Sequence, residues 1–117
     1  MNMDHTKIYQ RFLNLCSAID KMGEFPALEP YERCLLNKIN EYWVKDEPVS
    51  VLQVLDINQR QSRTTTHKYL KSLHSKGYID LIVDQKDNRF KYIQPSAMTC
   101  NYFNTLGKGL LETAAAI

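Results

Sequence analysis

Residues 62–96 constrain the fold of this chain more than any other stretch. They begin with a polar, basic segment, SRTTTHKYLKSLHSKG, whose apolar residues recur at helical spacing and which ends at Gly77, a residue suited to the position after a helix. Strand-forming residues follow over 78–83, then a charged turn over 86–89, then a second apolar run over 90–93. The sequence therefore predicts a helix followed by a charged two-stranded hairpin.

Apolar residues at helical spacing predict further helices over residues 4–21, 30–45, 51–57 and from about 96 to 111. Pro30 suits the first turn of the second of these helices. Ser50 caps the third, whose Leu52, Leu55 and neighbouring valines are expected to pack inward. Gly107 and Gly109 weaken the last helix, where we expect a kink or break.

This order of elements is typical of a mainly α (α+β) fold, a winged helix-turn-helix with a two-stranded β wing and flanking N- and C-terminal helices. A chain of 117 residues suits one domain, 1–117. We divide it into an N-terminal helix and connection (1–28), a winged-helix core (29–95) and a C-terminal helix (96–117).

The basic charge is concentrated in this segment. Residues 58–91 carry eight Lys or Arg against three Asp, whereas the remainder carries seven basic and ten acidic residues. A local excess of +5 favours a polyanion, because neutralising phosphates dominates non-specific affinity for nucleic acids. A solvated charged surface is the alternative, and charge alone does not exclude it.

The polar face of helix 62–76 holds the candidate DNA-reading residues Ser62, Arg63, Thr64, Thr65, His67, Lys68 and Lys71. Arg63 suits guanine O6 and N7, and Thr64 or Thr65 suits a thymine methyl or a phosphate. Ser62 combines helix capping with a phosphate contact. An ordinary amphipathic helix would also be polar here, but three successive threonines are poor helix formers, which favours a contact surface.

The turn of the hairpin holds the candidate wing residues Lys86, Asp87, Asn88, Arg89 and Lys91. Arg89 at the tip suits a narrow minor groove, and Asp87 is expected to hold its guanidinium. The alternative is a type I′-like turn in which Asp and Asn adopt left-handed geometry and the lysines protect the sheet edge.

Asp87-Asn88-Arg89 followed by Pro95-Ser96 resembles the D-x-R-x-x-x-x-x-L-T wing signature of MarR-type winged-helix regulators. The segment SRTTTHKYLKSLHSKGYI resembles their recognition helix in the same register, so the resemblance covers residues 62–96. Pro95 and Ser96 replace the usual Leu-Thr, and the turn before Ser62 is polar and longer than usual. The resemblance implies a sequence-specific regulator that binds double-stranded DNA.

The resemblance also implies a homodimer built by the helices at 6–21 and 96–111, although packing within one chain would explain their apolar surfaces equally well. It implies a small-molecule effector of unknown identity. Some members sense peroxide through a cysteine in the first helix, but Cys16 lies on the apolar stripe and is expected to be buried and inert.

Other functions lack sequence support. The three cysteines form no C-x-x-C pair, so we expect no disulfide, metal or cofactor, and burial as small hydrophobes. No catalytic motif is present, which predicts that the protein is not an enzyme. No apolar run is long enough for a membrane span and residues 1–22 do not resemble a signal peptide, so we expect a cytoplasmic protein. A winged helix used for protein contacts, or in a replication or phage-type complex, is the alternative function.

Overall fold

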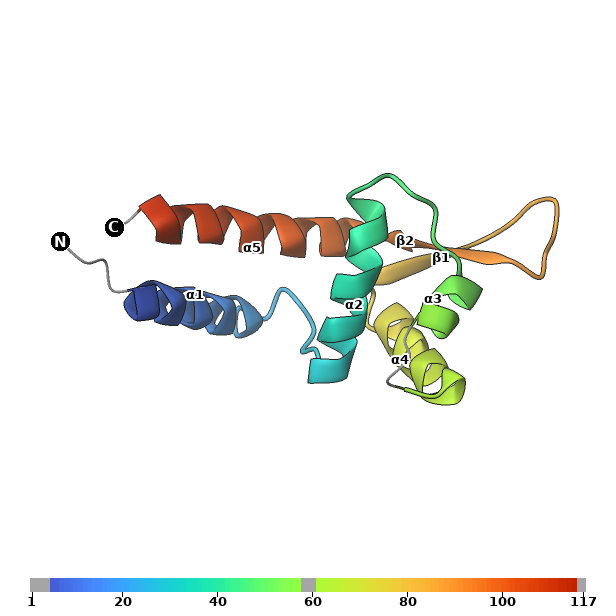
Figure 1. Ribbon diagram of the computed structural model, residues 1–117, viewed down its shortest axis with the longest axis horizontal. Helices are drawn as coiled ribbons and strands as arrows, with labels where there is room; N and C mark the ends of the chain where they lie inside the picture. The colour runs from blue at the N-terminus through green and yellow to red at the C-terminus, as the bar shows by residue number, and fades with distance from the viewer. Residues whose placement is uncertain (1–4, 58–60, 116–117) are drawn as a thin grey trace. The chain divides into compact units, whose positions relative to one another are not determined.

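The computed structural model describes residues 5–57 and 61–115, and it divides into two compact units (Figure 1). One unit is Leu28–Thr99, and the other combines Met1–Ala27 with Cys100–Ile117. The turn expected at residues 58–61 lies largely outside the described residues.

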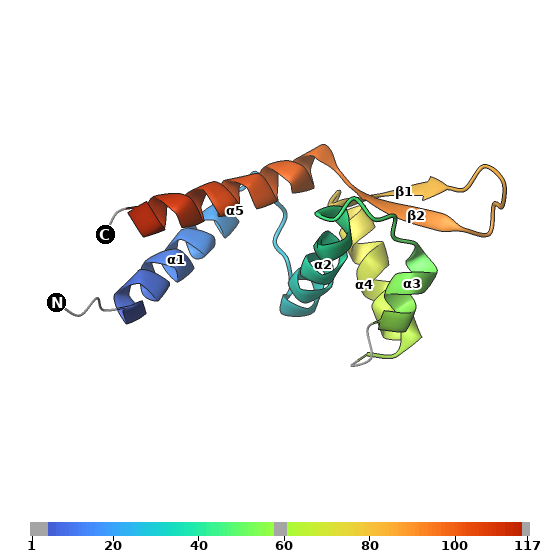
Figure 2. The same ribbon diagram turned by 45° about the horizontal axis from the view of Figure 1, so that its top comes forward.

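The unit Leu28–Thr99 holds three helices and a two-stranded sheet. These are α2 (Pro30–Trp43), α3 (Val51–Ile57), α4 (Arg63–Ser75), β1 (Ile79–Val83) and β2 (Lys91–Pro95). The strands are antiparallel, in a register that pairs Ile79 with Pro95 and Val83 with Lys91. Figures 1 and 2 both show the hairpin extending away from the helices of this unit. The expected mainly helical winged-helix fold is confirmed.

Local signals explain where these helices begin and end. At the start of α2, Glu29 and Glu32 form a capping box, with Pro30 in the first turn. The Ser50 hydroxyl accepts a hydrogen bond from the Gln53 amide (3.1 Å) at the start of α3, as predicted. Gly77 follows α4 with a φ of 86°, a conformation that other residues rarely adopt.

The core of this unit comes from all three helices and the sheet. Its buried aliphatic residues are Leu35, Leu36, Ile39, Val49, Val54, Leu70, Leu73, Ile79 and Ile93. Ile93 also donates its amide to the Val49 carbonyl (2.8 Å), which ties the connection before α3 to β2. Val54 occupies the core as predicted, but the prediction for α3 was wrong for Leu52, which is exposed. A helix of two turns presents only one narrow face to the core, and Val54 lies on it.

The second unit contains α1 (His5–Asp20) and α5 (Ala97–Ala115), whose last 16 residues belong to it. Leu15 of α1 lies against Gly109, and the Phe25 and Tyr102 rings meet edge-on with centroids 5.1 Å apart. The kink or break expected at Gly107 and Gly109 was wrong, because α5 continues through both glycines. Packing against another helix outweighs a local propensity cost of about 1 kcal/mol per glycine.

The burial of the cysteines differs from the prediction. Cys34 and Cys100 are exposed and Cys16 is half-buried, so the predicted burial is wrong for the first two. Both occupy solvent-facing positions of otherwise amphipathic helices, which the spacing of neighbouring apolar residues did not separate from the buried ones. Across residues 5–57 and 61–115, no cluster of His, Cys, Asp or Glu could hold a metal ion, and no helix is long and apolar enough to cross a membrane.

Candidate nucleic-acid interface

The outer face of α4 is polar and basic. Its buried side is formed by Thr66, Leu70 and Leu73. The predicted contact residues Arg63, Thr64, His67, Lys68 and Lys71 are all exposed. The structure therefore presents most of the predicted reading residues together on one solvent-facing helix surface.

The start of α4 is held by its own side chains. The Ser62 hydroxyl accepts the Thr65 amide hydrogen (3.1 Å) and donates to Thr65 Oγ1 (2.9 Å). Ser62 is thus the N-cap, as predicted, and Thr65 is half-buried beside it. Thr64 is the more exposed of the two threonines proposed to touch DNA.

Arg63 has a partner that the sequence did not reveal. Its Nη2 lies 2.9 Å from Oδ1 of Asp56 at the end of α3, and both side chains are largely exposed. Because exposed ion pairs are worth little, a competing ligand can displace this one at small cost. Asp56 therefore orients the Arg63 side chain in the free protein, and Arg63 can still exchange this partner for another.

The hairpin tip holds Arg89 in a defined orientation. Arg89 Nε donates to Asp87 Oδ1 (3.0 Å) and Nη2 donates to Oδ2 (2.9 Å), a two-bond pairing of planar groups. The Arg89 amide also donates to Asp87 Oδ1 (3.1 Å). These bonds lower the pKa of Asp87 and raise that of Arg89. The expectation that Asp87 holds the guanidinium is confirmed, while the Arg89 side chain stays 86% exposed.

The alternative proposed for the hairpin, a type I′-like turn, is wrong. Seven residues, 84–90, separate the strands, and the Asp84 amide donates to the Phe90 carbonyl (2.9 Å). Asp46 is the one non-glycine residue with positive φ among the described residues, so Asp87 and Asn88 are not left-handed. Aspartate side chains shape the loop instead, since Asp84 Oδ1 accepts the Lys86 amide (2.8 Å).

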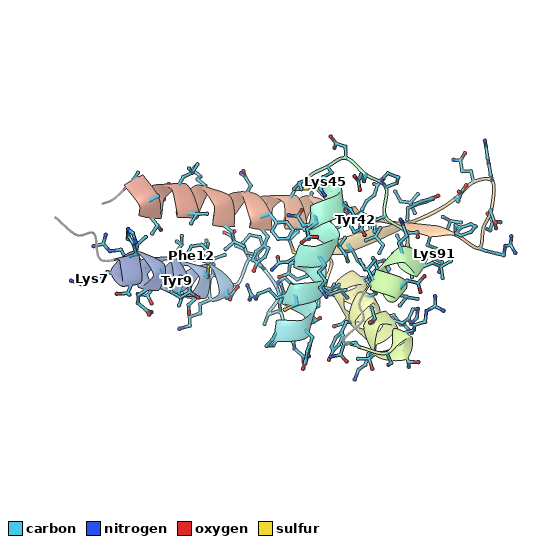
Figure 3. The ribbon with its side chains drawn as sticks, viewed as in Figure 1. Lys7, Tyr9, Phe12, Tyr42, Lys45 and Lys91 are labelled. Carbon is cyan, nitrogen blue, oxygen red and sulfur yellow. The ribbon has the colours of Figure 1, made fainter. Side chains whose placement is uncertain are left out.

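The groove between α4 and the sheet adds further basic groups. A pocket of about 390 Å³ brings His67, Lys71 and His74 of α4 together with Lys91 of β2, labelled in Figure 3. The apolar residues Val51, Leu70 and Leu81 also line it, and none of the described residues that line it is acidic. Lysine and histidine side chains in such a groove suit a backbone phosphate. Lys86 and Asn88 are exposed on the hairpin loop.

A buried carboxylate fixes α4 against α2. Glu32 is 1% exposed; its Oε1 accepts from Lys76 Nζ (2.5 Å) and its Oε2 from the Ser72 hydroxyl (2.6 Å). Burial raises the pKa of Glu32, but the bonds from Lys76, Ser72 and the Glu29 amide outweigh it and hold the pKa below its usual value. The sequence did not predict this pair, because nothing in the spacing along the chain links Glu32 to Lys76, which lies 44 positions away.

Comparisons with known proteins agree on the fold. No family model matches the chain, and no curated protein matches it in sequence. Among solved structures it is similar to the YusO protein from Bacillus subtilis, at 13% identity and a TM-score of 0.60, with 96% of this chain and 71% of that chain covered. A MarR-like transcriptional regulator from Thermotoga maritima is 13% identical with a TM-score of 0.58, covering 98% and 83% of the two chains.

A third similar structure is reduced AbfR bound to DNA. It is 14% identical, with a TM-score of 0.56, and the match covers 92% of this chain and 73% of that chain. At such identities the likeness concerns the arrangement of helices and strands, and it extends the resemblance seen in residues 62–96 to nearly the whole chain. This chain therefore has the winged-helix fold of MarR-type transcriptional regulators.

Proposed function

We propose that this protein is a transcriptional regulator that binds double-stranded DNA in a sequence-specific manner. One observation carries the proposal: the exposed basic face of α4 is accompanied by a hairpin whose tip holds Arg89 ready in a two-bond pair with Asp87. The fold shared with AbfR, whose structure was solved bound to DNA, supports it. The proposed function is recognition rather than catalysis.

In this proposal each element has a separate role. The first turns of α4 enter the major groove, where Arg63 and Thr64 contact base edges and His67 and Lys68 follow on the same helix. Lys71 and Lys91 contact phosphates from the groove between α4 and the sheet. The wing residues Lys86, Asp87, Asn88 and Arg89 contact the neighbouring backbone or minor groove.

We also propose that the protein acts as a homodimer through α1 and α5. Apolar side chains of these helices remain open to solvent, among them Tyr9, Leu110 and Leu111. Tyr9 and Leu110 line an almost wholly apolar groove together with Ile8 and Phe12. Tyr9 and Phe12 are labelled on α1 in Figure 3. A second copy that covers these residues would remove them from water and place two α4 helices on one DNA site. The predicted small-molecule effector stays a prediction.

The deciding experiment is selection from a pool of random duplex DNA, followed by anisotropy titrations of the enriched sequence at two salt concentrations. Enrichment of a palindrome with steep salt dependence is expected, because each neutralised phosphate contributes a slope of about −0.9. Equal affinity for enriched and scrambled duplexes would reject sequence-specific reading. Loss of all salt-sensitive binding would reject DNA binding itself and leave a winged helix used for protein contacts.

A further inference from the structure

A second cavity lies apart from the proposed DNA interface. It has a volume of about 520 Å³ and is bounded by the end of α2, the connection to α3 and both strands of the sheet. None of the α4 or hairpin residues assigned to DNA lines it. Its size falls in the range of small-molecule sites, roughly 300–1,000 Å³.

Two aromatic side chains form fixed walls of this cavity. The indole Nε1 of Trp43 donates to the Ile93 carbonyl (3.0 Å), and the Tyr92 hydroxyl donates to Asp84 Oδ2 (3.4 Å). These hydrogen bonds hold both rings in place, so little side-chain conformational entropy is lost when a ligand binds against the ring faces. Ile82 on β1 adds an exposed apolar surface to the same cavity.

The charge of the cavity is opposite to that of the DNA face. Asp46 and Glu47 line it from the α2–α3 connection, and none of the lining residues in the described part of the chain is Lys, Arg or His. In a chain with a calculated isoelectric point near 8.4, this is a local reversal of charge. Aromatic faces beside carboxylates attract cations that carry apolar groups, because the ring quadrupole and the negative charge act in the same direction.

From these features we propose that the cavity binds a small organic cation, a protonated or quaternary amine with an apolar body. The apolar part lies against Trp43, Tyr92 and Ile82, and the ammonium group lies toward Asp46 and Glu47. The proposal does not depend on the proposed DNA-binding function, since the site and its occupant can be measured with no DNA present.

Trp43 provides the readout, because it is the only tryptophan in the chain. Its fluorescence and its single indole N–H resonance are followed while the full-length protein is titrated with benzyltrimethylammonium. Benzyl alcohol and phenylacetate serve as neutral and anionic controls of similar size, at constant ionic strength. We expect a saturable shift of the Trp43 signals with the cation and a much weaker response to the two controls.

Two substitutions locate the charge selectivity. Asp46→Asn keeps a residue that tolerates the positive φ of 54° at this position, and Glu47→Gln keeps the side-chain shape. Each should weaken cation binding roughly two- to five-fold, as expected for loss of one solvent-accessible carboxylate. Glu41→Gln, an exposed acid of α2 outside the cavity, is the matched control and should leave the affinity unchanged.

Three outcomes would overturn the proposal. A response of equal strength to all three probes would show an apolar pocket without charge selectivity. No saturable change of the Trp43 resonance would show that the cavity takes no such ligand. Cation binding unaffected by the Asp46→Asn and Glu47→Gln double substitution would place the cation elsewhere. Because DNA is absent throughout, each outcome leaves the proposed regulatory function untouched.

Discussion

Arg89 and Asp87 form a small rigid unit at the end of the hairpin. The guanidinium is almost fully exposed, yet two hydrogen bonds to one carboxylate fix its plane and direction. A long arginine side chain normally loses much rotamer freedom when it binds, and this pair has already restricted it in the free protein. The unit is therefore suited to insertion of a charged group at a defined place.

The first prediction concerns the charge of Arg89. Arg89→Ala should weaken binding to all duplexes and reduce the magnitude of the salt slope by about one, because one phosphate contact is lost. Anisotropy titrations over a range of salt concentrations measure both quantities. Lys45→Ala is the matched control: Lys45 is exposed at the C-terminal end of α2, which Figure 3 shows well away from α4 and the hairpin tip. Equal losses in the two variants would remove the wing from the interface.

The second prediction distinguishes two effects of Asp87: its negative charge and its role in orienting the Arg89 side chain. Asp87→Ala removes a negative charge from a surface that faces a polyanion, so electrostatics alone predicts tighter DNA binding. If Asp87 instead holds Arg89 in place, the variant should bind DNA several-fold more weakly, because Arg89 must be ordered on binding. Titration of the selected duplex gives the sign of the change. Tighter binding by the variant would mean that the pairing has no role in DNA recognition.

The third prediction concerns Glu32, which joins α2 to α4. Glu32→Gln keeps the shape of the side chain but removes the charge that faces Lys76. The free energy of unfolding should fall by about 3 kcal/mol, as is common when one partner of a buried ion pair is lost. Urea denaturation measures this change, and the exposed Glu41→Gln should have almost no effect. A loss below 1 kcal/mol in Glu32→Gln would show that Ser72 and the packing around it hold α4 without the charge.

The same pair makes stability depend on pH. The folded protein lowers the pKa of Glu32 below the value of about 4.3 that glutamate has in an unfolded chain. Its contribution is therefore complete above about pH 5 and is lost as the pH falls from there through the folded pKa. The stability gap between the native protein and Glu32→Gln should be constant from pH 6 to 8 and narrow below pH 4. A gap that widens on acidification would contradict the assigned pKa direction.

At the scale of elements, α5 continues through two glycines that occupy different surroundings. A Cβ atom at Gly107 would meet nothing within 4 Å, whereas one at Gly109 would clash with Cδ2 of Leu15 and lie 3.1 Å from its Cγ. Gly109 thus permits the close approach of α1 and α5 within their unit, and Gly107 serves no such contact. Helix propensity assigns both glycines the same cost, and only the packing around each one distinguishes them.

The fourth prediction uses this difference. Gly107→Ala should raise the free energy of unfolding by about 0.5–1 kcal/mol, since alanine stabilises a helix interior relative to glycine. Gly109→Ala should lose that gain and add an overpacking cost of about 1–3 kcal/mol as Leu15 is displaced. Thermal and urea unfolding of the two single variants give the comparison directly. Equal stabilisation by both would show that α1 yields at Leu15 without cost.

At the scale of the whole molecule, DNA recognition by a winged helix gains specificity when two copies read neighbouring half-sites. The apolar residues that α1 and α5 leave exposed are those that a second copy would cover. Leu111 is 73% exposed, and Leu110 beside it is 50% exposed.

The fifth prediction tests this assembly. Leu111→Asp should convert a dimer into a monomer, because a carboxylate would be buried in an apolar interface. Light scattering coupled to size-exclusion chromatography measures the mass, and affinity for the palindrome should fall together with it. Val44→Asp changes a comparably exposed apolar residue on the other unit, at 70% exposure, and should alter neither. A monomeric native protein would refute the dimer and leave the DNA-binding proposal to its own test.

The sequence by itself determined the elements and several of their ends. Ser62 caps α4, Gly77 follows it, and α3 spans the predicted residues Val51–Ile57, because caps, glycine conformations and apolar periodicity act over a few neighbouring residues. The pairing of Asp87 with Arg89 was predictable for the same reason, since the partners lie only two positions apart in the chain.

The tertiary structure decided what distant residues do together. It joined Glu32 to Lys76, brought Asp56 to Arg63, placed Cys34 and Cys100 in solvent, and kept α5 unbroken at Gly109. It also set Trp43 beside Tyr92 around one cavity. The physical reason is common to all of these: burial, ion pairing and close packing depend on which surfaces meet once the helices and strands have assembled, and spacing along the chain does not encode that choice.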